Sequence, residues 1–423
     1  MCPFGERFDT AGRGHLGRRQ PHSRMREGTG MATYAIKADR FFLPGSSVDG
    51  GYLTVSDGVF GTWSAQAPEG VEVRDYTGSW IAPGMVDTHI HGFYNHATID
   101  ADAAGINASS EALARCGTTS WVPTTFTDDA EHIGECCAAI AKADEVRGAD
   151  FRGAHIQGIY LEGPFFTMKH VGAQNPAYLI DPSCEVFAKW QQAAGGRIVK
   201  SALAPEREGS EAYIAALDAE GVVTSIGHSD ATYEEALAAV NAGATCFVHT
   251  YNGMRGLHHR EPGTLGCAMA TPETYAEVIC DGKHVQPAAI KALVRAKGWQ
   301  HSVLITDCLG CGGMPEGHYM SGGLPVVMKD GLCYLENEDG SIGNIAGSVL
   351  TLARGVKNVV DWGIASADEA IRMATEVAAR SARIDARCGS IKPGRDADFV
   401  VFDHELNLRE TYLAGESLGA PEY

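Results

Sequence analysis

The chain has 423 residues, of which 44% are apolar and 21% are charged, an ordinary composition for a soluble globular protein. Its formal net charge of −19 argues against nucleic acid or an anionic membrane as a partner, so an anionic substrate would need a local cluster of basic groups. No apolar run reaches the roughly 18 residues that a membrane helix requires.

The first thirty residues differ in composition from the rest of the chain. They contain six arginines and three acidic residues, so they carry about +3 while the remainder carries about −22 (−19 − 3). They lack the apolar segment of a secretory signal peptide. We expect residues 1–30 to be a disordered tail or an over-extended start, with Met31 opening the folded chain.

Twelve cysteines are present, without the spacing of a small disulfide scaffold. In a chain of this size and with no secretory leader, they favour a reduced, cytoplasmic protein. Cys308 and Cys311 form the one CxxC, which on its own is weak evidence for a redox or zinc site.

Both ends of the folded chain consist of short alternating segments broken by Gly, Asp and Ser. At the start these are "YAIKADRFFL", "GGYLTVSDGVFGTWS" and "VEVRDYTGSW", and at the end "GSIKPGRDADFVVFD" and "LRETYLAGE". Such alternation predicts strands. We expect residues 31–80 and 390–423 to form one small β-sandwich domain from both chain ends.

The middle of the chain alternates strands and helices. Helical stretches such as "SEAYIAALDAE" and "DATYEEALAAVNA" end at a glycine and are followed by an apolar strand. The predicted strands are "GMVDTHI", "TTSWVP", "HIQGIYLEG", "IVKSALAP", "VVTSIGH", "TCFVH", "YAEVIC" and "SVLITD". Eight strands alternating with helices predict a (β/α)8 TIM-type barrel over residues 81–389. A doubly wound open sheet is the competing fold, but the chain has no GxGxxG loop.

Polar residues stand at five of these strand ends. They are His89 and His91, Glu162, His228, His249 and Asp307. Catalytic groups in a barrel come from the carboxyl ends of its strands. His89 and His91 are two residues apart on a strand, so both face the same side and can reach one ion. Four histidines and two carboxylates together suit a divalent metal.

Each of these residues also has a structural explanation. A single histidine facing the barrel is more often a satisfied core residue than a ligand. Glu162 alone could be a buried structural acid, and Asp307 could cap the turn that follows it. All six at one end of a barrel are harder to explain without a metal, because buried unpaired carboxylates are costly.

Several longer motifs carry a family resemblance. They are "PGMVDTHIHG", "GTTSWVPT", "GIYLEGPFF", "KHVGAQNPA", "SIGHSDAT", "VHTYNGMRGLHHREPGTLG", "DGKHVQP", "LITDCLGCGGMPEGHY" and "GSIKPGRDADFVVFD". The chain resembles the amidohydrolase superfamily, and within it the family of N-acetylglucosamine-6-phosphate deacetylases. The resemblance covers nearly everything from Met31 onward. "LEGPF" with "HHREPG" is far more specific than HxH, which many hydrolases share.

The resemblance implies one or two divalent metal ions. His89, His91, Glu162, His228 and His249 match metal-ligand positions, and Glu162 would bridge if two ions are bound. Zinc, iron, manganese and cobalt all suit such ligands. Asp307 matches the residue that takes the proton of the attacking water and returns a proton to the leaving amine.

The resemblance also implies residues that bind the substrate. Asn252, Gly253, Arg260 and His284 match positions that hold the sugar phosphate, and Gln174 stands where some members have a histidine touching the acetyl carbonyl. In the family, the equivalent of Arg260 reaches across a dimer interface into the neighbouring site, so a homodimer is expected. "TDCLGCGG" departs from a run usually rich in alanine and methionine, which points to a different amino sugar as an alternative.

Three functions are therefore in competition. The first is a metal-dependent amidohydrolase that removes the acetyl group from N-acetylglucosamine 6-phosphate. The second is a related deacetylase of N-acetylgalactosamine 6-phosphate or of another N-acyl substrate. The third is a non-catalytic sugar-phosphate sensor, against which the six intact metal and proton-transfer positions argue.

Overall fold

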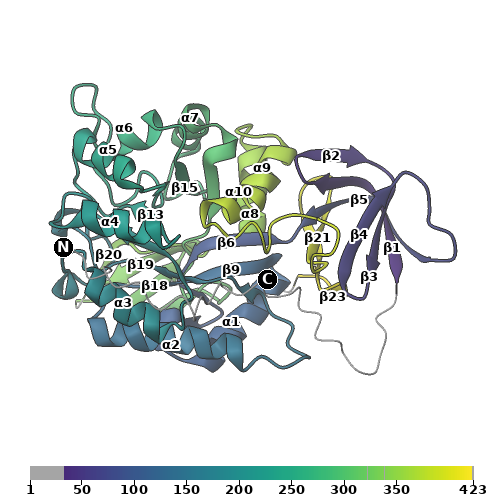
Figure 1. Ribbon diagram of the computed structural model, residues 1–423, viewed down its shortest axis with the longest axis horizontal. Coiled ribbons are helices and arrows are strands. Elements are labelled where there is room, and N and C mark those ends of the chain that lie inside the picture. Colours follow the sequence, from purple (N-terminus) through teal and green to yellow (C-terminus); the bar gives the residue numbers. More distant parts are fainter. Residues whose placement is uncertain (1–32, 322, 338, 422–423) are drawn as a thin grey trace.

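The computed structural model describes residues 33–321, 323–337 and 339–421, and Figure 1 shows how its elements are arranged. The expectation for residues 1–30 lies outside the described residues. A barrel forms most of the molecule, and a sheet built from both ends of the chain lies beside it (Figure 1). The predicted fold class, a (β/α)8 TIM-type barrel with a small β-sandwich domain formed from both chain ends, is confirmed.

All eight predicted barrel strands form, and each pairs in parallel with the next. They are β6 (Met85–Ile90), β9 (Thr118–Thr125), β11 (Ile159–Leu161), β12 (Ile198–Leu203), β13 (Val223–Ile226), β14 (Cys246–Phe247), β15 (Tyr275–Ile279) and β16 (Ser302–Ile305). The short strand β10 (His155–Ile156) also pairs with β9. The barrel closes where the backbone N–H of Asp307 donates to the carbonyl of His89 at 2.9 Å.

The strands alternate between an outer and an inner face. In β11, Ile159 and Leu161 pack in the apolar cluster that also contains helix residues. Tyr160 between them contacts the His89 ring and the Lys200 ammonium inside the barrel. This period of two is what aims alternate side chains at the interior.

Helices cover the outside of the barrel (Figure 1). They are α1 (Ala103–Arg115), α2 (Ala130–Glu145), α3 (Cys184–Ala193), α4 (Ser210–Ala219), α5 (Tyr233–Ala242), α6 (Gly263–Ala270), α7 (Pro287–Lys297), α8 (Leu352–Asp361), α9 (Ala367–Met373) and α10 (Glu376–Ser381). Local capping sets several starts, as where the Thr232 hydroxyl and the Glu235 carboxylate form a capping box at α5. Within the described ranges, every helix is too short or too polar to span a bilayer.

The β domain is a single hydrogen-bonded sheet in the order β23-β22-β21-β5-β1-β3-β4, with β2 paired to β1. Its strands are β1 (Tyr34–Leu43), β2 (Ser46–Asp49), β3 (Tyr52–Ser56), β4 (Val59–Ser64), β5 (Glu72–Pro83), β21 (Phe399–Asp403), β22 (Leu408–Leu413) and β23 (Glu416–Ser417). Phe60 of β4 and Phe399 of β21 are separated by three strands, yet their ring centroids are 6.2 Å apart. The sheet therefore curls around its own core. We propose the boundaries expected from the sequence, 31–80 with 390–423 around 81–389.

The chain passes from this domain into the barrel at Pro83 and Gly84. A Cβ at Gly84 would collide with the side chain of Thr119 in β9. The absence of a side chain at Gly84 thus allows the start of β6 to pack closely against β9.

A four-stranded antiparallel sheet between β16 and α8 was not predicted. Its strands are β17 (Gly317–Ser321), β18 (Leu324–Lys329), β19 (Leu332–Glu336) and β20 (Ile342–Ile345). It packs through Val326 and Met328 on a cluster that includes Phe126 and Leu309. Cys311 also joins this contact, with its sulfur 3.5 Å from that of Cys333. The sheet therefore covers the loop that follows the last barrel strand.

The remaining short elements lie in the loops. They are β7 (Gly92–Phe93), β8 (His96–Ala97) and the 3-10 helices η2 (Thr98–Asp100), η3 (Met168–His170), η4 (Pro176–Tyr178) and η5 (Trp299–His301).

Candidate active site

The six polar residues predicted at the strand ends converge at the carboxyl end of the barrel, and all are buried. They are His89 in β6, His91 just after it, Glu162 just after β11, and His228, His249 and Asp307 two residues beyond β13, β14 and β16. Residues far apart in the sequence are therefore brought together by the order of the strands.

The Glu162 carboxylate lies at the centre of the group. Its Oε1 is 3.1 Å from His249 Nε2, 3.2 Å from His228 Nε2 and 3.3 Å from His89 Nε2. Its Oε2 is 3.1 Å from His91 Nε2. One carboxylate thus faces four imidazole nitrogens.

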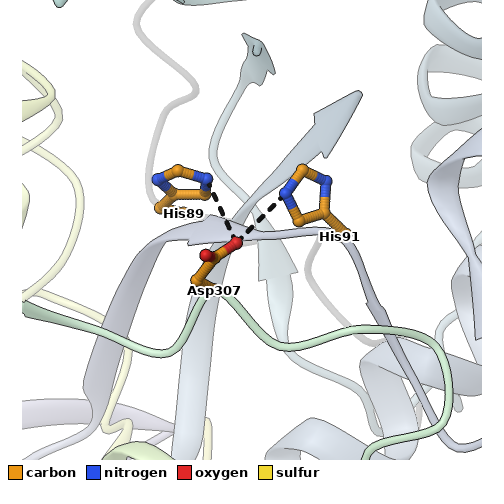
Figure 2. Close-up of side chains that lie close together, drawn as sticks. All are labelled: His89, His91 and Asp307. Carbon is orange, nitrogen blue, oxygen red and sulfur yellow. Dashed lines mark ion pairs between the residues drawn. The ribbon is translucent and has the colours of Figure 1, made fainter. Parts of the chain in front are cut away.

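Asp307 is a second carboxylate close to His89 and His91. Figure 2 shows its carboxylate between the two rings, with Oδ1 3.5 Å from His89 Nε2 and 3.2 Å from His91 Nε2. Two groups of possible metal ligands result, His89, His91 and Asp307 in one and Glu162, His228 and His249 in the other.

The other ring nitrogen of three histidines is held in place. Nδ1 of His89 lies 3.0 Å from Glu277 Oε2, Nδ1 of His91 lies 3.2 Å from the Thr124 carbonyl, and Nδ1 of His228 lies 2.8 Å from the His170 carbonyl. Carbonyl and carboxylate oxygens accept, so each Nδ1 donates and Nε2 is left to bind a cation.

These contacts fit a divalent cation. Nε2 atoms of neutral histidines would meet the lone pairs of Glu162, and Nε2 of His228 and His249 lie 3.1 Å apart. Nε2 of His89 makes no hydrogen bond within the described residues. A positive ion among these atoms would offset the repulsion between the imidazole and carboxylate lone pairs. The histidine and carboxylate donors suit zinc and related metals.

Three of the six residues adopt left-handed backbone conformations. The φ angle is 46° at His228, 23° at His249 and 52° at Asp307. Non-glycine residues adopt this region at a cost, and such residues gather at functional sites. The chain therefore bends sharply just after these strands and turns the side chains toward the centre.

A buried ion pair beneath His89 was missed from the sequence. Glu277 in β15 accepts from His89 with one oxygen and from the Lys200 ammonium in β12 with the other. Both side chains are fully buried. A charged residue inside an apolar strand, as in "IVKSAL" and "YAEVI", is the signal that could have identified them.

The charges in the site favour ionised carboxylates. The same Nε2 atoms, when protonated, also stabilise the carboxylates. Burial alone would raise the pKa of Glu162, but a charged His89 and hydrogen bonds from protonated His228 and His249 hold it well below its usual value. Burial likewise opposes the charge on Asp307, yet His89 and His91 lower its pKa. Asp307 is therefore a carboxylate at neutral pH, the form in which it can accept a proton.

A cavity of about 220 Å³ opens over this group. Most of the predicted residues line it: His91, Glu162, Gln174, His228, His249, Asn252, Gly253, His284 and Asp307. Leu309, Val326 and Leu335 add an apolar wall that includes residues of the unpredicted sheet. His89 does not line the cavity itself, but its Nε2 lies 3.3 Å from Glu162 Oε1.

Two predicted substrate residues differ in how they are engaged. The Gln174 amide donates to Glu162 Oε2 at 2.6 Å and accepts from the Thr127 N–H at 2.7 Å. It therefore holds the Glu162 carboxylate, one of the possible metal ligands, in position. Arg260 is exposed and does not line the cavity of its own chain. Of the predicted substrate residues, it is the one that the fold does not bring to the site.

The chain is similar to known proteins over most of its length. The model of the Amidohydrolase family matches residues 80–418. N-acetylglucosamine-6-phosphate deacetylase of Vibrio furnissii is 39% identical over 337 residues, 79% of this chain and 82% of that protein. N-acetylgalactosamine-6-phosphate deacetylase of Escherichia coli is 34% identical over 384 residues, 91% of this chain and 99% of that protein. A mutant N-acetyl-D-glucosamine-6-phosphate deacetylase of Mycobacterium smegmatis, solved with N-acetyl-D-glucosamine-6-phosphate, has a TM-score of 0.85 and 29% identity, covering 92% of this chain and 100% of that one.

Proposed function

The chain belongs to the amidohydrolase family, and on that premise we propose that it hydrolyses N-acetylglucosamine 6-phosphate to glucosamine 6-phosphate and acetate. The observation that carries the proposal is the set of four imidazole nitrogens around the Glu162 carboxylate, with Asp307 beside it. Two relatives that align over more than four fifths of their own length, and a solved structure covered over 100% of its chain, bear the same deacetylase name.

The proposed metal ligands are His89, His91, Glu162, His228 and His249, and they fit one or two divalent ions. When bound, such a cation supplies Lewis-acid chemistry, lowering the pKa of water from 15.7 toward about 7 and polarising the amide carbonyl. Zinc, iron, manganese and cobalt are the candidates.

Asp307 is the proposed proton-transfer residue. Its carboxylate takes a proton from the attacking water and then returns a proton to the departing sugar amine, which is a poor leaving group unless protonated. Its lowered pKa keeps the carboxylate ionised for the first step, and its place in the cavity wall puts it beside the substrate for both. No serine or cysteine nucleophile is needed.

The sugar phosphate is proposed to lie against Asn252, Gly253 and His284, which line the same cavity. Gln174 is proposed to contact the acetyl end of the substrate, an assignment supported by the hydrogen bond that its amide donates to Glu162. We propose that Arg260 completes the phosphate site of a neighbouring copy in a homodimer, since it is exposed and does not line the cavity of its own chain. A cytoplasmic location is proposed because the twelve cysteines lack the spacing of a small disulfide scaffold.

Deacetylation of N-acetylgalactosamine 6-phosphate is the second candidate. It is favoured by a relative of that name that aligns over 99% of its length. The two sugars differ in one hydroxyl orientation, so the same metal and proton chemistry serves both.

Acetate release from the two epimers tests these proposals. We expect wild type loaded with Zn²⁺ to release acetate from N-acetylglucosamine 6-phosphate, and Asp307→Asn to lose roughly a hundredfold or more of that rate. Faster release from the galacto epimer would make N-acetylgalactosamine 6-phosphate the preferred substrate and leave the proposed reaction unchanged. Binding of both sugar phosphates without any acetate release would support the non-catalytic sensor instead.

A further inference from the structure

Asp281 and His284 form a compact pair in the loop between β15 and α7. Asp281 Oδ1 accepts the backbone N–H groups of Lys283 at 2.8 Å and His284 at 2.9 Å. Asp281 Oδ2 accepts from His284 Nδ1 at 2.6 Å, a length typical of a charge-assisted hydrogen bond. One oxygen therefore shapes the turn, and the other holds the imidazole.

The free end of the His284 ring faces the cavity. The side chain is only 7% exposed and lines the cavity. Its Nε2 makes no hydrogen bond to the described residues, although the backbone of Gly347 lies close enough to favour the protonated ring. A buried donor without a partner is costly unless a ligand completes it.

The cavity has little other positive charge to offer an anion. None of the described residues that line it is an arginine or a lysine. Glu162 and Asp307 add negative charge. The positive charge that balances a bound phosphate must therefore come from a protonated histidine, from a metal or from a group outside the chain. The other three histidines of the lining, His91, His228 and His249, are turned to Glu162, which leaves His284 as the imidazole free to meet the phosphate.

We propose that Asp281 is a positioning residue that holds His284 as a cationic donor for the anionic group of the substrate. The inference deepens the proposed function and rests on it for the identity of the sugar phosphate. Burial alone would discourage a charge on His284, but its pKa is raised by the hydrogen bond and charge of Asp281. An imidazolium has an N–H at both ends, so Nδ1 stays with the carboxylate while Nε2 donates into the cavity.

The test separates the charge of Asp281 from its role in the turn. Asp281→Asn keeps an Oδ1 that can accept both backbone N–H groups, but it removes the negative charge from the atom facing His284. Asp403→Asn is the matched control, because Asp403 also accepts two backbone N–H groups in a turn, in the β domain. Titration calorimetry with glucosamine 6-phosphate and with glucosamine compares these variants in the Zn²⁺-loaded full chain.

We expect Asp281→Asn to weaken binding of glucosamine 6-phosphate by roughly tenfold or more, with glucosamine unaffected and Asp403→Asn like wild type. In acetate release, the KM for the phosphorylated substrate should rise while kcat stays within about twofold. His284→Ala alone should bind as weakly as Asp281→Asn combined with His284→Ala, since the carboxylate acts through the ring.

Three results would overturn the proposal. They are equal losses for the phosphorylated and unphosphorylated sugars, additive losses in the double variant, and a wild type that binds both sugars equally. The binding readout does not depend on turnover. Tighter binding of the phosphorylated sugar in a protein that releases no acetate would leave the Asp281 proposal standing and defeat the proposed reaction.

Discussion

Glu277 links the site to the barrel core through a single carboxylate. It holds His89 with one oxygen and compensates the buried Lys200 with the other. Burial would raise its pKa, but Lys200 and His89 lower it to about 2, so the group is charged at any working pH. Two consequences follow, one for stability and one for metal binding, and they can be measured separately.

We expect Glu277→Gln to cost roughly 3–5 kcal/mol of unfolding free energy, because it leaves the Lys200 charge buried and unpaired. Adding Lys200→Met should restore much of that loss. Metal affinity should fall by about 10–100-fold in both variants, since His89 loses its charged partner in each. Urea unfolding and Zn²⁺ titration provide the two measurements. Metal affinity that recovers together with stability would show that Glu277 does not act on His89.

The helix α7 ends at a buried lysine whose charge has no carboxylate partner among its hydrogen bonds. Lys297 is 4% exposed, and its ammonium donates to the Thr271 carbonyl at 2.5 Å and to Thr274 Oγ1 at 2.8 Å. Burial lowers its pKa from 10.5 to about 8. The helix is thus anchored to the start of β15 by an ammonium group that loses its proton at a lower pH in the folded chain than in the unfolded one.

This anchor predicts a pH-dependent stability. Between about pH 8 and 10.5 the unfolded chain binds the proton more strongly than the folded one, so the free energy of unfolding rises with pH in this window. Relative to Lys297→Met, wild type should gain up to about 1.4 kcal/mol per pH unit. Chemical unfolding of both proteins at pH 7.5, 8.5 and 9.5 measures the difference, in which all other titrations cancel. A difference that stays flat, or falls, would contradict the account.

At the scale of the whole molecule, the sequence was sufficient for the barrel and for the six residues at its mouth. Polar residues recur along the chain where predicted strands end, and a parallel barrel brings the carboxyl ends of its strands together on one face. Contacts between distant strands were not accessible in this way: Glu277 and Lys200 are 77 residues apart, and neither lies at a strand end. The sheet β17–β20 was missed because its strands are short and alternate with turns such as Asp330-Gly331, which look like loop from the sequence alone.

The remaining differences concern how side chains are used. The family resemblance placed Gln174 at the acetyl group, and the fold shows it bound to Glu162 and to Thr127 as well. The partner of His284 was within the quoted "DGKH" motif, but only the turn geometry reveals that Asp281 holds the ring. Local spacing indicates which residues meet, whereas the hydrogen bonds decide what each of them does.

The central claim is that Glu162 gathers a divalent cation on which hydrolysis depends. The most direct measurement is metal bound per chain, by elemental analysis after chelation and reloading with Zn²⁺, together with acetate release for wild type and Glu162→Gln. We predict that stripped wild type is inactive and that reloading restores both metal and activity. Glu162→Gln should recover neither, because an uncharged carboxamide with one oxygen would replace the carboxylate that lies among the four imidazole nitrogens. Full acetate release by the stripped wild type, or undiminished metal and activity in Glu162→Gln, would contradict the claim.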